Sequence, residues 1–284
     1  MQNIHTHTWN QALHIAPETV READLSRGRP LDLTVLVDAY IEDIAPFDRV
    51  VTFGLKGRLT GYWVPDDYVA DFVAQVNTRA PGKAVGFASC DPTQEGAMEE
   101  LVHAVEDLGL QGLKLGPIYA GFDPRSLGCE SIYAYCEQRC LPILFHTGTT
   151  YNRAAPLGVS RPWLLDEIAI RFPELRMVMA HLGHPFYEEC LVVIRKHPHL
   201  YADISALFYR PWQFYNMLIT AQEYNVTHKL LFGSDYPFAG AQESVQGLRN
   251  VNLITAESGL PRVTEATIEG ILNRDALGLL GVSR

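Results

Sequence analysis

The sequence predicts a single (β/α)8 barrel that spans residues 1–284. Eight short β-rich runs alternate along the chain with longer segments whose apolar residues have helical spacing. No long polar linker and no internal repeat interrupts this alternation, which favours one parallel barrel with its helices outside. An open doubly wound sheet is the structural alternative. It often carries a glycine-rich phosphate turn after its first strand, whereas the first run here ends in histidines.

Each strand-like run ends in polar residues or glycine, and a helical segment follows most of them. We expect strands at Asn3–Thr8, Arg49–Leu55, Ala84–Cys90, Gly112–Leu115, Pro142–Thr147, Arg176–His181, Leu200–Ser205 and Lys229–Asp235. We expect helices at Leu31–Ile44, Asp66–Arg79, Gln94–Leu108, Leu127–Arg139, Trp163–Phe172, Tyr187–Lys196, Trp212–Glu223, Glu243–Thr255, Thr264–Leu272 and Arg274–Leu280.

Composition and charge exclude several classes of protein. The net charge is −10 without a basic stripe, which argues against nucleic acid and anionic membrane surfaces as partners. No apolar run reaches the roughly 18 residues of a membrane span, and the first residues do not resemble a signal peptide. The five cysteines contain no C-x-x-C pair, so a reducing, cytoplasmic location is expected.

Five groups suited to metal binding or acid–base chemistry lie at the carboxyl ends of four predicted strands. His5 and His7 are two apart on one strand, so both imidazoles face the same way. His146, His181 and Asp235 each end another strand. The carboxyl ends of barrel strands form the active-site rim, so these positions predict a metal site there. For His5 and His7 alone, a pair of solvated histidines would be the simpler interpretation.

The motifs at these positions resemble those of the amidohydrolase superfamily, in the amidohydrolase-related branch that also contains metal-dependent nonoxidative decarboxylases. The matching stretches are IHTHT, GLKLGP, LFHTG, MAHLGHP, YADIS, FGSDYPF and ILNRDALGLLG, in the family's order. The resemblance implies a divalent metal held by His5, His7, His146 and Asp235. It also implies that His181 is a nearby acid–base or orienting residue.

The chemistry of this ligand set agrees with the resemblance. Three imidazoles and a carboxylate suit Zn²⁺ best, with Mn²⁺ or Fe²⁺ as alternatives. Asp235 would accept a proton from a metal-activated water, so it is expected to be catalytic as well as a ligand. His181 would polarise the substrate or position the water. Strand alternation would place His181 on the inner face together with Met177 and Met179.

Three further residues are expected near the mouth. Lys114 would face the barrel interior, where it either pairs with a protein carboxylate or binds a substrate carboxylate. In some branches of the superfamily a carbamylated lysine after the fourth strand bridges two metals, whereas this branch usually carries one. Asp203 would face inward and orient His181, or cap the following loop. His184 would line the mouth, or it would only cap the loop on which it lies.

Two long stretches after the predicted fourth and fifth strands offer substrate contacts. They supply Tyr119, Arg153 and Arg161, and an arginine there indicates a carboxylate-bearing substrate. The apolar segment Leu207–Leu218 is larger than one helix face needs, which together with the family resemblance predicts a homodimer or larger homo-oligomer. Packing of the same segment onto the barrel is the alternative.

Three functions remain open from the sequence. The first is a metal-dependent hydrolase that cleaves an ester, lactone or amide bond of a small organic substrate. The second is a metal-dependent nonoxidative decarboxylase of a small aromatic or enoic acid, which needs the same five groups. The third is a barrel that binds a metabolite without turnover.

Overall fold

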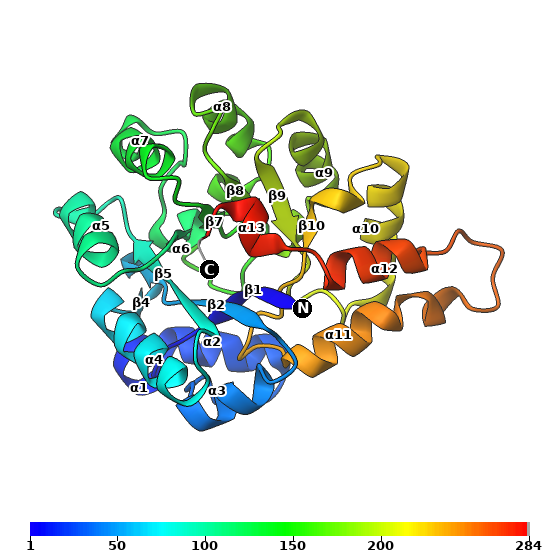
Figure 1. Ribbon diagram of the computed structural model, residues 1–284, viewed down its shortest axis with the longest axis horizontal. Coiled ribbons are helices and arrows are strands. Elements are labelled where there is room, and N and C mark those ends of the chain that lie inside the picture. The colour runs from blue at the N-terminus through cyan, green and yellow to red at the C-terminus, as the bar shows by residue number, and fades with distance from the viewer. Residues whose placement is uncertain (283–284) are drawn as a thin grey trace.

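Eight parallel strands lie edge to edge in chain order around a central axis (Figure 1). The computed structural model describes residues 1–282. The strands are β1 (Gln2–His7), β2 (Arg49–Phe53), β5 (Ala84–Cys90), β6 (Leu113–Leu115), β7 (Ile143–Phe145), β8 (Met177–Met179), β9 (Leu200–Asp203) and β10 (Leu230–Leu231). Each of the eight falls within a predicted run or extends it by one residue. The barrel architecture predicted from the sequence is therefore confirmed.

The barrel closes between β1 and the residues that follow β10. The Ile4 amide donates to the Phe232 carbonyl over 3.0 Å, and the Asp235 amide donates to the His5 carbonyl over 2.8 Å. Further along, the His7 amide donates to the Tyr236 carbonyl over 2.8 Å. Regular strand geometry in β10 lasts only two residues, but these bonds continue the pairing to the mouth.

Helices surround the strands on the outside, as Figure 1 shows for α4, α5, α7, α8, α9 and α10. The helices are α1 (Gln11–His14), α2 (Pro17–Arg27), α3 (Val37–Asp43), α4 (Asp66–Arg79), α5 (Ala97–Glu106), α6 (Pro117–Ala120), α7 (Glu130–Gln138), α8 (Leu164–Arg171), α9 (Tyr187–Lys196), α10 (Pro211–Glu223), α11 (Ala241–Arg249), α12 (Glu265–Leu272) and α13 (Ala276–Leu280). Acidic residues in the first turns of α4, α5, α8 and α9 complement the helix dipoles.

The barrel interior is filled by one inward-facing set of side chains and is closed at its base by α13. The inward set comprises Ile4, Val51, Phe53, Val85, Phe87, Leu144, Val178, Ala180, Tyr201 and Leu231. Leu277 and Leu280 of α13 pack against this set. The Leu277 amide also donates to Gln2 Oε1 over 2.8 Å, which ties α13 to the start of β1. Figure 1 shows α13 crossing in front of the strands.

The strand alternation predicted from the sequence is wrong for β8. Met177 and Met179 belong to the outer core between strands and helices, whereas Val178 and Ala180 face inward. His181 therefore does not reach the mouth by simple alternation with the methionines. It lies beyond the strand, where both His181 and Leu182 adopt left-handed backbone conformations (φ 56° and 49°).

The region between β1 and β2 also differs from the prediction. Helix α2 was not predicted, although Pro17 at its start and the left-handed Gly28 at its end are typical helix boundaries. The predicted helix Leu31–Ile44 is helical only in α3. Its first residues are extended because the Val35 amide donates to the Trp9 carbonyl over 2.9 Å. A short hairpin of β3 (Lys56–Gly57) and β4 (Tyr62–Trp63) follows β2.

Among residues 1–282, no helix has both the length and the apolar composition needed to cross a membrane.

We predict that removing a side chain from the base of the barrel is costly. Leu277→Ala should lower the free energy of unfolding by about 2–5 kcal/mol, because Leu277 is 1% exposed and closes the interior core. The control is Leu279→Ala on the same helix, where the side chain is 37% exposed and the change should stay below about 1 kcal/mol. Urea unfolding measures both, and equal losses would show that α13 does not close the barrel.

The expected homo-oligomer stays a prediction, with a weaker basis than the sequence suggested. Phe214, Tyr215, Met217 and Leu218 of the apolar segment are buried within the chain's own core. Trp212, which is 53% exposed, is the large side chain left for a partner on this segment. Light scattering at micromolar concentration should report at least twice the 31.8 kDa of one chain. A monomeric mass would refute the expectation.

Candidate active site

A cavity of about 540 Å³ opens at the carboxyl ends of the strands, where the predicted site residues were expected. Its lining includes His7, Lys114, His146, His181 and Asp235. Aromatic side chains form much of the remaining wall: Trp9, Tyr62, Tyr119, Tyr151, Tyr209 and Phe238. The volume is in the range of small-molecule sites, and a wall that combines aromatic side chains with convergent polar groups is typical of them.

Three of the predicted metal ligands converge on one point. Asp235 Oδ1 lies 3.2 Å from His5 Nε2 and 3.2 Å from His7 Nε2. The ligand atoms of these three residues all lie within 4.8 Å of one another. His5 Nε2 is buried and has no hydrogen-bond partner, although it is this close to a carboxylate oxygen. A buried lone pair without a partner, beside a second imidazole and a carboxylate, is the environment that a divalent cation requires.

The barrel closure positions these three side chains. The bond from the Asp235 amide to the His5 carbonyl sets the two residues side by side across the last pair of strands. Asp235 has a left-handed backbone (φ 73°), which turns its carboxylate towards the mouth. Gly233 lies two residues before Asp235 and packs against His5. A Cβ added at Gly233 would lie 2.8 Å from the Cβ of His5. Close approach of the two backbones therefore requires glycine at position 233.

Asp203 contacts the ligand His5 directly, rather than the His181 ring as predicted. His5 Nδ1 donates to Asp203 Oδ2 over 2.8 Å, so in the neutral ring Nε2 carries the lone pair and is able to bind a metal. The other oxygen, Oδ1, accepts from the amides of His181 and Ser205 over 3.0 Å each. Asp203 thus holds His5 by its ring and His181 by its backbone.

The His181 ring reaches the cavity beside the ligands and is held by Ser205. Its Nδ1 lies 2.8 Å from Ser205 Oγ and 3.2 Å from the Ser205 carbonyl oxygen. A carbonyl only accepts, so Nδ1 carries the proton and Nε2 has a free lone pair. The ring centroid lies 4.9 Å from that of His5 and 5.0 Å from that of His146. His181 is therefore adjacent to the ligand group, in the position predicted for an acid–base residue.

His146 lies in the same cavity but not in the close group of ligand atoms. Its Nε2 donates to the Thr149 carbonyl over 3.2 Å, and its Nδ1 lies 3.5 Å from the Tyr119 hydroxyl. For Nε2 to serve as a metal ligand, its hydrogen bond to Thr149 must break. The assignment of His146 as fourth ligand stays a prediction.

The ionisation states of the site fit a cation. Burial lowers the pKa of His7 to about 3 and also lowers those of His146 and His181, so these imidazoles are neutral near pH 7. At His5, burial also acts to lower the pKa, but the nearby Asp203 charge outweighs it and raises the pKa above its ordinary value, so metal binding at Nε2 would displace a proton. Burial alone would raise the pKa of Asp235, but the adjacent His5 and His7 rings hold that pKa well below the ordinary value. Neutral imidazoles and an ionised carboxylate are the forms that bind metal.

Lys114 faces the barrel interior, as predicted. Its ammonium nitrogen is buried without a hydrogen-bond partner and lies 4.8 Å from the centre of the Phe53 ring. Burial lowers the pKa of Lys114 to about 8, although the Asp203 and Asp235 charges act in the opposite direction. It forms none of the direct ion pairs found among residues 1–282, so its three donors are available to a bound molecule.

Three of the five predicted substrate contacts line the cavity and two do not, and Lys114 is one of the three. Tyr119 and His184 are part of the wall. Arg161 instead forms an ion pair with Glu189 and stacks on the Phe186 ring, 3.9 Å from its centre. Arg153 is exposed at the surface and does not contribute to the wall. Their loop does reach the mouth, but these two side chains point away from it.

Two arginines of the cavity wall were not predicted from the sequence. They are Arg27 at the end of α2 and Arg210 before α10. Tyr151, which the sequence places in the loop after the predicted fifth strand, lines the cavity as expected for that loop, and its hydroxyl lies 2.7 Å from that of Tyr62. The helix-boundary residues of α2 would have revealed the position of Arg27. No sequence signal distinguishes Arg210 from other loop arginines.

Fold and site together describe a barrel with a candidate metal site at its mouth, and comparison with known proteins identifies its family. The sequence profile of the amidohydrolase family matches residues 4–282. The chain therefore belongs to the amidohydrolase family. The members are enzymes, so a barrel that only binds a metabolite is not supported. No curated protein matches the sequence.

Three solved structures share the fold at low sequence identity. An uncharacterised TIM-barrel protein from Bordetella bronchiseptica is 20% identical, with 99% of each chain covered and a TM-score of 0.72. A probable 2-pyrone-4,6-dicarboxylic acid hydrolase from Acinetobacter baumannii is 16% identical, with 99% of this chain and 98% of that chain covered and a TM-score of 0.68. A dihydroxybenzoic acid decarboxylase from Polaromonas with bound manganese is 15% identical, with 100% and 97% covered and a TM-score of 0.65.

We predict that substitution of His5 or His7 abolishes metal binding, whereas substitution of His181 does not. His5→Asn and His7→Asn should each lose stoichiometric metal, because each removes a nitrogen of the close group. Asp203→Asn should weaken metal binding by about 10–100-fold, since it releases the His5 ring. His181→Asn should retain the metal. Elemental analysis of dialysed protein measures all four, and metal loss in His181→Asn with retention in His5→Asn would reverse the assignment.

We predict that Lys114 destabilises the fold below pH 8. The ordinary pKa of 10.5 falls to about 8 in the folded chain, so the unfolded chain binds more protons between these values and stability rises with pH there. In metal-free protein, Lys114→Met should be about 3 kcal/mol more stable than wild type at pH 7, and the difference should vanish above pH 10.5.

The control is Lys196→Met on the surface, where the ion pair with Asp166 contributes little. Urea unfolding at several pH values measures the difference. A gain for Lys114→Met that does not depend on pH would show that packing, and not the buried charge, is responsible.

Proposed function

We propose that this protein is a metal-dependent hydrolase that cleaves an ester, lactone or amide bond of a small organic molecule. The observation that carries the proposal is the convergence of His5 Nε2, His7 Nε2 and Asp235 Oδ1 at the cavity, next to the His181 ring. We propose Zn²⁺ as the cofactor, because a set rich in neutral imidazoles suits it best. When bound, such a cation makes water acidic enough to lose a proton near neutral pH and polarises a carbonyl oxygen.

Asp235 and His181 divide the proton chemistry between them. Asp235 remains ionised in the folded chain, so it is able to accept the proton of the attacking water and return it to the leaving group. His181 presents an unprotonated Nε2, so it accepts a hydrogen bond from the water and orients it. This arrangement favours the positioning role considered for His181 over carbonyl polarisation, which would require Nε2 to donate.

Lys114, Tyr119 and His184 are available to bind the substrate. Lys114 supplies an ammonium group without a partner inside the cavity. Burial and the nearby Arg210 charge lower the pKa of His184 to about 4, so His184 is neutral near pH 7. A neutral imidazole and the phenol of Tyr119 hydrogen-bond to a substrate without adding charge.

A nonoxidative decarboxylase of a small aromatic or enoic acid is the second candidate. The fold is similar to that of a dihydroxybenzoic acid decarboxylase with bound manganese, which supports this second candidate. The similarity to a probable 2-pyrone-4,6-dicarboxylic acid hydrolase supports the first candidate to the same degree. Both reactions would use the same donors and the same histidine.

Product analysis separates the two reactions. Metal-loaded protein is incubated with a panel of lactones, esters and amides, and with a panel of aromatic and enoic acids. A new carboxylate with consumption of water identifies the hydrolase. Release of CO₂ from the acids, with the lactones, esters and amides unchanged, would refute the hydrolase and establish the alternative.

We predict that His181→Asn lowers turnover by about 10²–10⁴-fold on the substrate found by this panel, the usual contribution of a positioned acid–base group. The matched control is His199→Asn, a partly exposed histidine at the start of β9 whose nearest carboxylate is on Glu174, 3.6 Å away. Turnover of His199→Asn should equal that of wild type. Equal activity of both variants would exclude a catalytic role for His181.

A further inference from the structure

Two arginines face the cavity without a carboxylate partner. Arg27 donates to the Tyr209 hydroxyl over 2.9 Å, and Arg210 donates to the Ala206 carbonyl over 3.0 Å. Neither guanidinium takes part in an ion pair among residues 1–282, in contrast to Arg161, which is paired with Glu189. The acidic group in the cavity wall is Asp235, and no hydrogen bond or ion pair within the described chain joins it to either arginine.

Both guanidinium groups are close to one aromatic ring. The central carbon of Arg27 lies 4.4 Å from the centre of the Tyr209 ring, and that of Arg210 lies 4.6 Å from it. Contact with the ring offsets part of the cost of holding each cation, but it leaves the two positive charges near each other. An anion that reaches both charges would remove this repulsion and gain charge-assisted hydrogen bonds.

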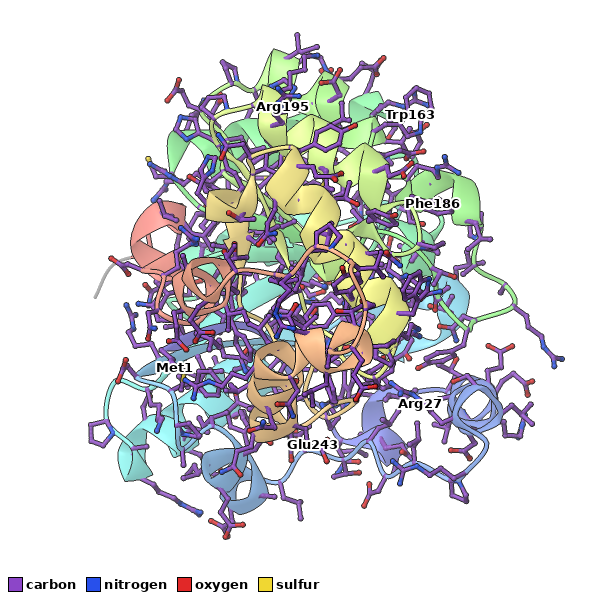
Figure 2. All side chains as sticks on the ribbon, turned by 90° about the vertical axis from the view of Figure 1, so that its right-hand side faces the viewer. Met1, Arg27, Trp163, Phe186, Arg195 and Glu243 are labelled. Atoms are coloured by element: carbon purple, nitrogen blue, oxygen red, sulfur yellow. The ribbon has the colours of Figure 1, made fainter. Side chains whose placement is uncertain are left out.

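Arg27 is accessible from outside the barrel mouth as well as from the cavity. A second hollow, of about 560 Å³, shares Arg27, Tyr209 and Phe238 with the cavity, so these residues form part of the wall between the two. Figure 2 shows Arg27 on the side of the molecule opposite Met1, which marks the base of the barrel. In a chain of net charge −10, two unpaired arginines at the mouth would attract an anion that the rest of the surface repels.

We propose that Arg27 and Arg210 together bind a carboxylate group of the substrate, while the bond to be cleaved lies at His5, His7 and Asp235. This inference rests on the proposed function and specifies its substrate class as a small organic acid. The planar fork of a guanidinium matches a carboxylate in two parallel hydrogen bonds. The aromatic walls formed by Trp9, Tyr119 and Phe238 favour a flat, cyclic acid over a flexible one.

Calorimetric titration of the full chain tests the proposal. The probes are isophthalate, its neutral diamide and inorganic phosphate, each titrated into chelator-treated and into zinc-loaded protein. Arg27→Gln and Arg210→Gln should each raise the dissociation constant of isophthalate about tenfold or more, with or without zinc. Arg27→Lys should lie between wild type and Arg27→Gln, because the charge remains and the fork is lost.

The control is Arg195→Gln, because Arg195 is an exposed arginine on α9 that lies against Tyr224 and outside both hollows. It should bind isophthalate as wild type does. Thermal unfolding of each variant confirms that the fold is retained, and Arg27→Lys keeps the test valid if Arg27→Gln unfolds.

Four results would overturn the proposal. The first is absence of isophthalate binding to wild-type protein, and the second is unchanged binding in both glutamine variants. The third is diamide binding as tight as that of isophthalate. The fourth is tighter binding of phosphate with the same losses, which would mark a phosphate site. Because binding is measured without turnover, a failure of the proposed hydrolase leaves this result unaffected.

Discussion

The buried carboxylate of Asp203 is the interaction on which the candidate site depends. It is fully buried, and it accepts hydrogen bonds from the His5 ring and from the amides of His181 and Ser205. An unpaired carboxylate at this depth would be very unfavourable, so these bonds fix the surrounding residues in place. They determine the tautomer of His5 and the backbone path at His181. Asp203 therefore connects β1, which carries the candidate ligand His5, to the residues after β8 that include His181.

The cavity wall combines two kinds of chemistry. Imidazoles and a carboxylate form a group suited to a cation, and Arg27 and Arg210 are cations without a carboxylate partner. Lys114 lies buried within the barrel, and its ammonium has no hydrogen-bond partner of its own. A molecule that contacts both kinds of group is oriented before any bond is broken, and such orientation is a large part of enzymatic rate enhancement.

The sequence predicted the parts of the site that follow regular strand geometry. Leu144 fills the barrel interior, and His146, two residues later, reaches the cavity. Asp203 also faces inward as expected. Both outcomes follow because side chains alternate with a period of two along these strands. The same rule failed at His181, where left-handed residues break the alternation after β8. It also gave no information on Arg153 and Arg161, because the direction of a loop side chain depends on contacts with distant residues. Arg27 was not predicted because helix α2 was not predicted, although Pro17 and Gly28 are typical residues for the start and end of a helix.

The closure of the barrel has a consequence for synthesis of the protein on the ribosome. His5 and Asp235 are far apart in the sequence, and the first strand pairs along one edge with residues 232–236. While the intervening chain is being translated, that edge of β1 has no partner, and exposed strand edges are prone to wrong pairing and aggregation. The group of His5, His7 and Asp235 likewise cannot assemble before Asp235 has left the exit tunnel. Any cation that this group holds would therefore be loaded late, after most of the chain has been translated.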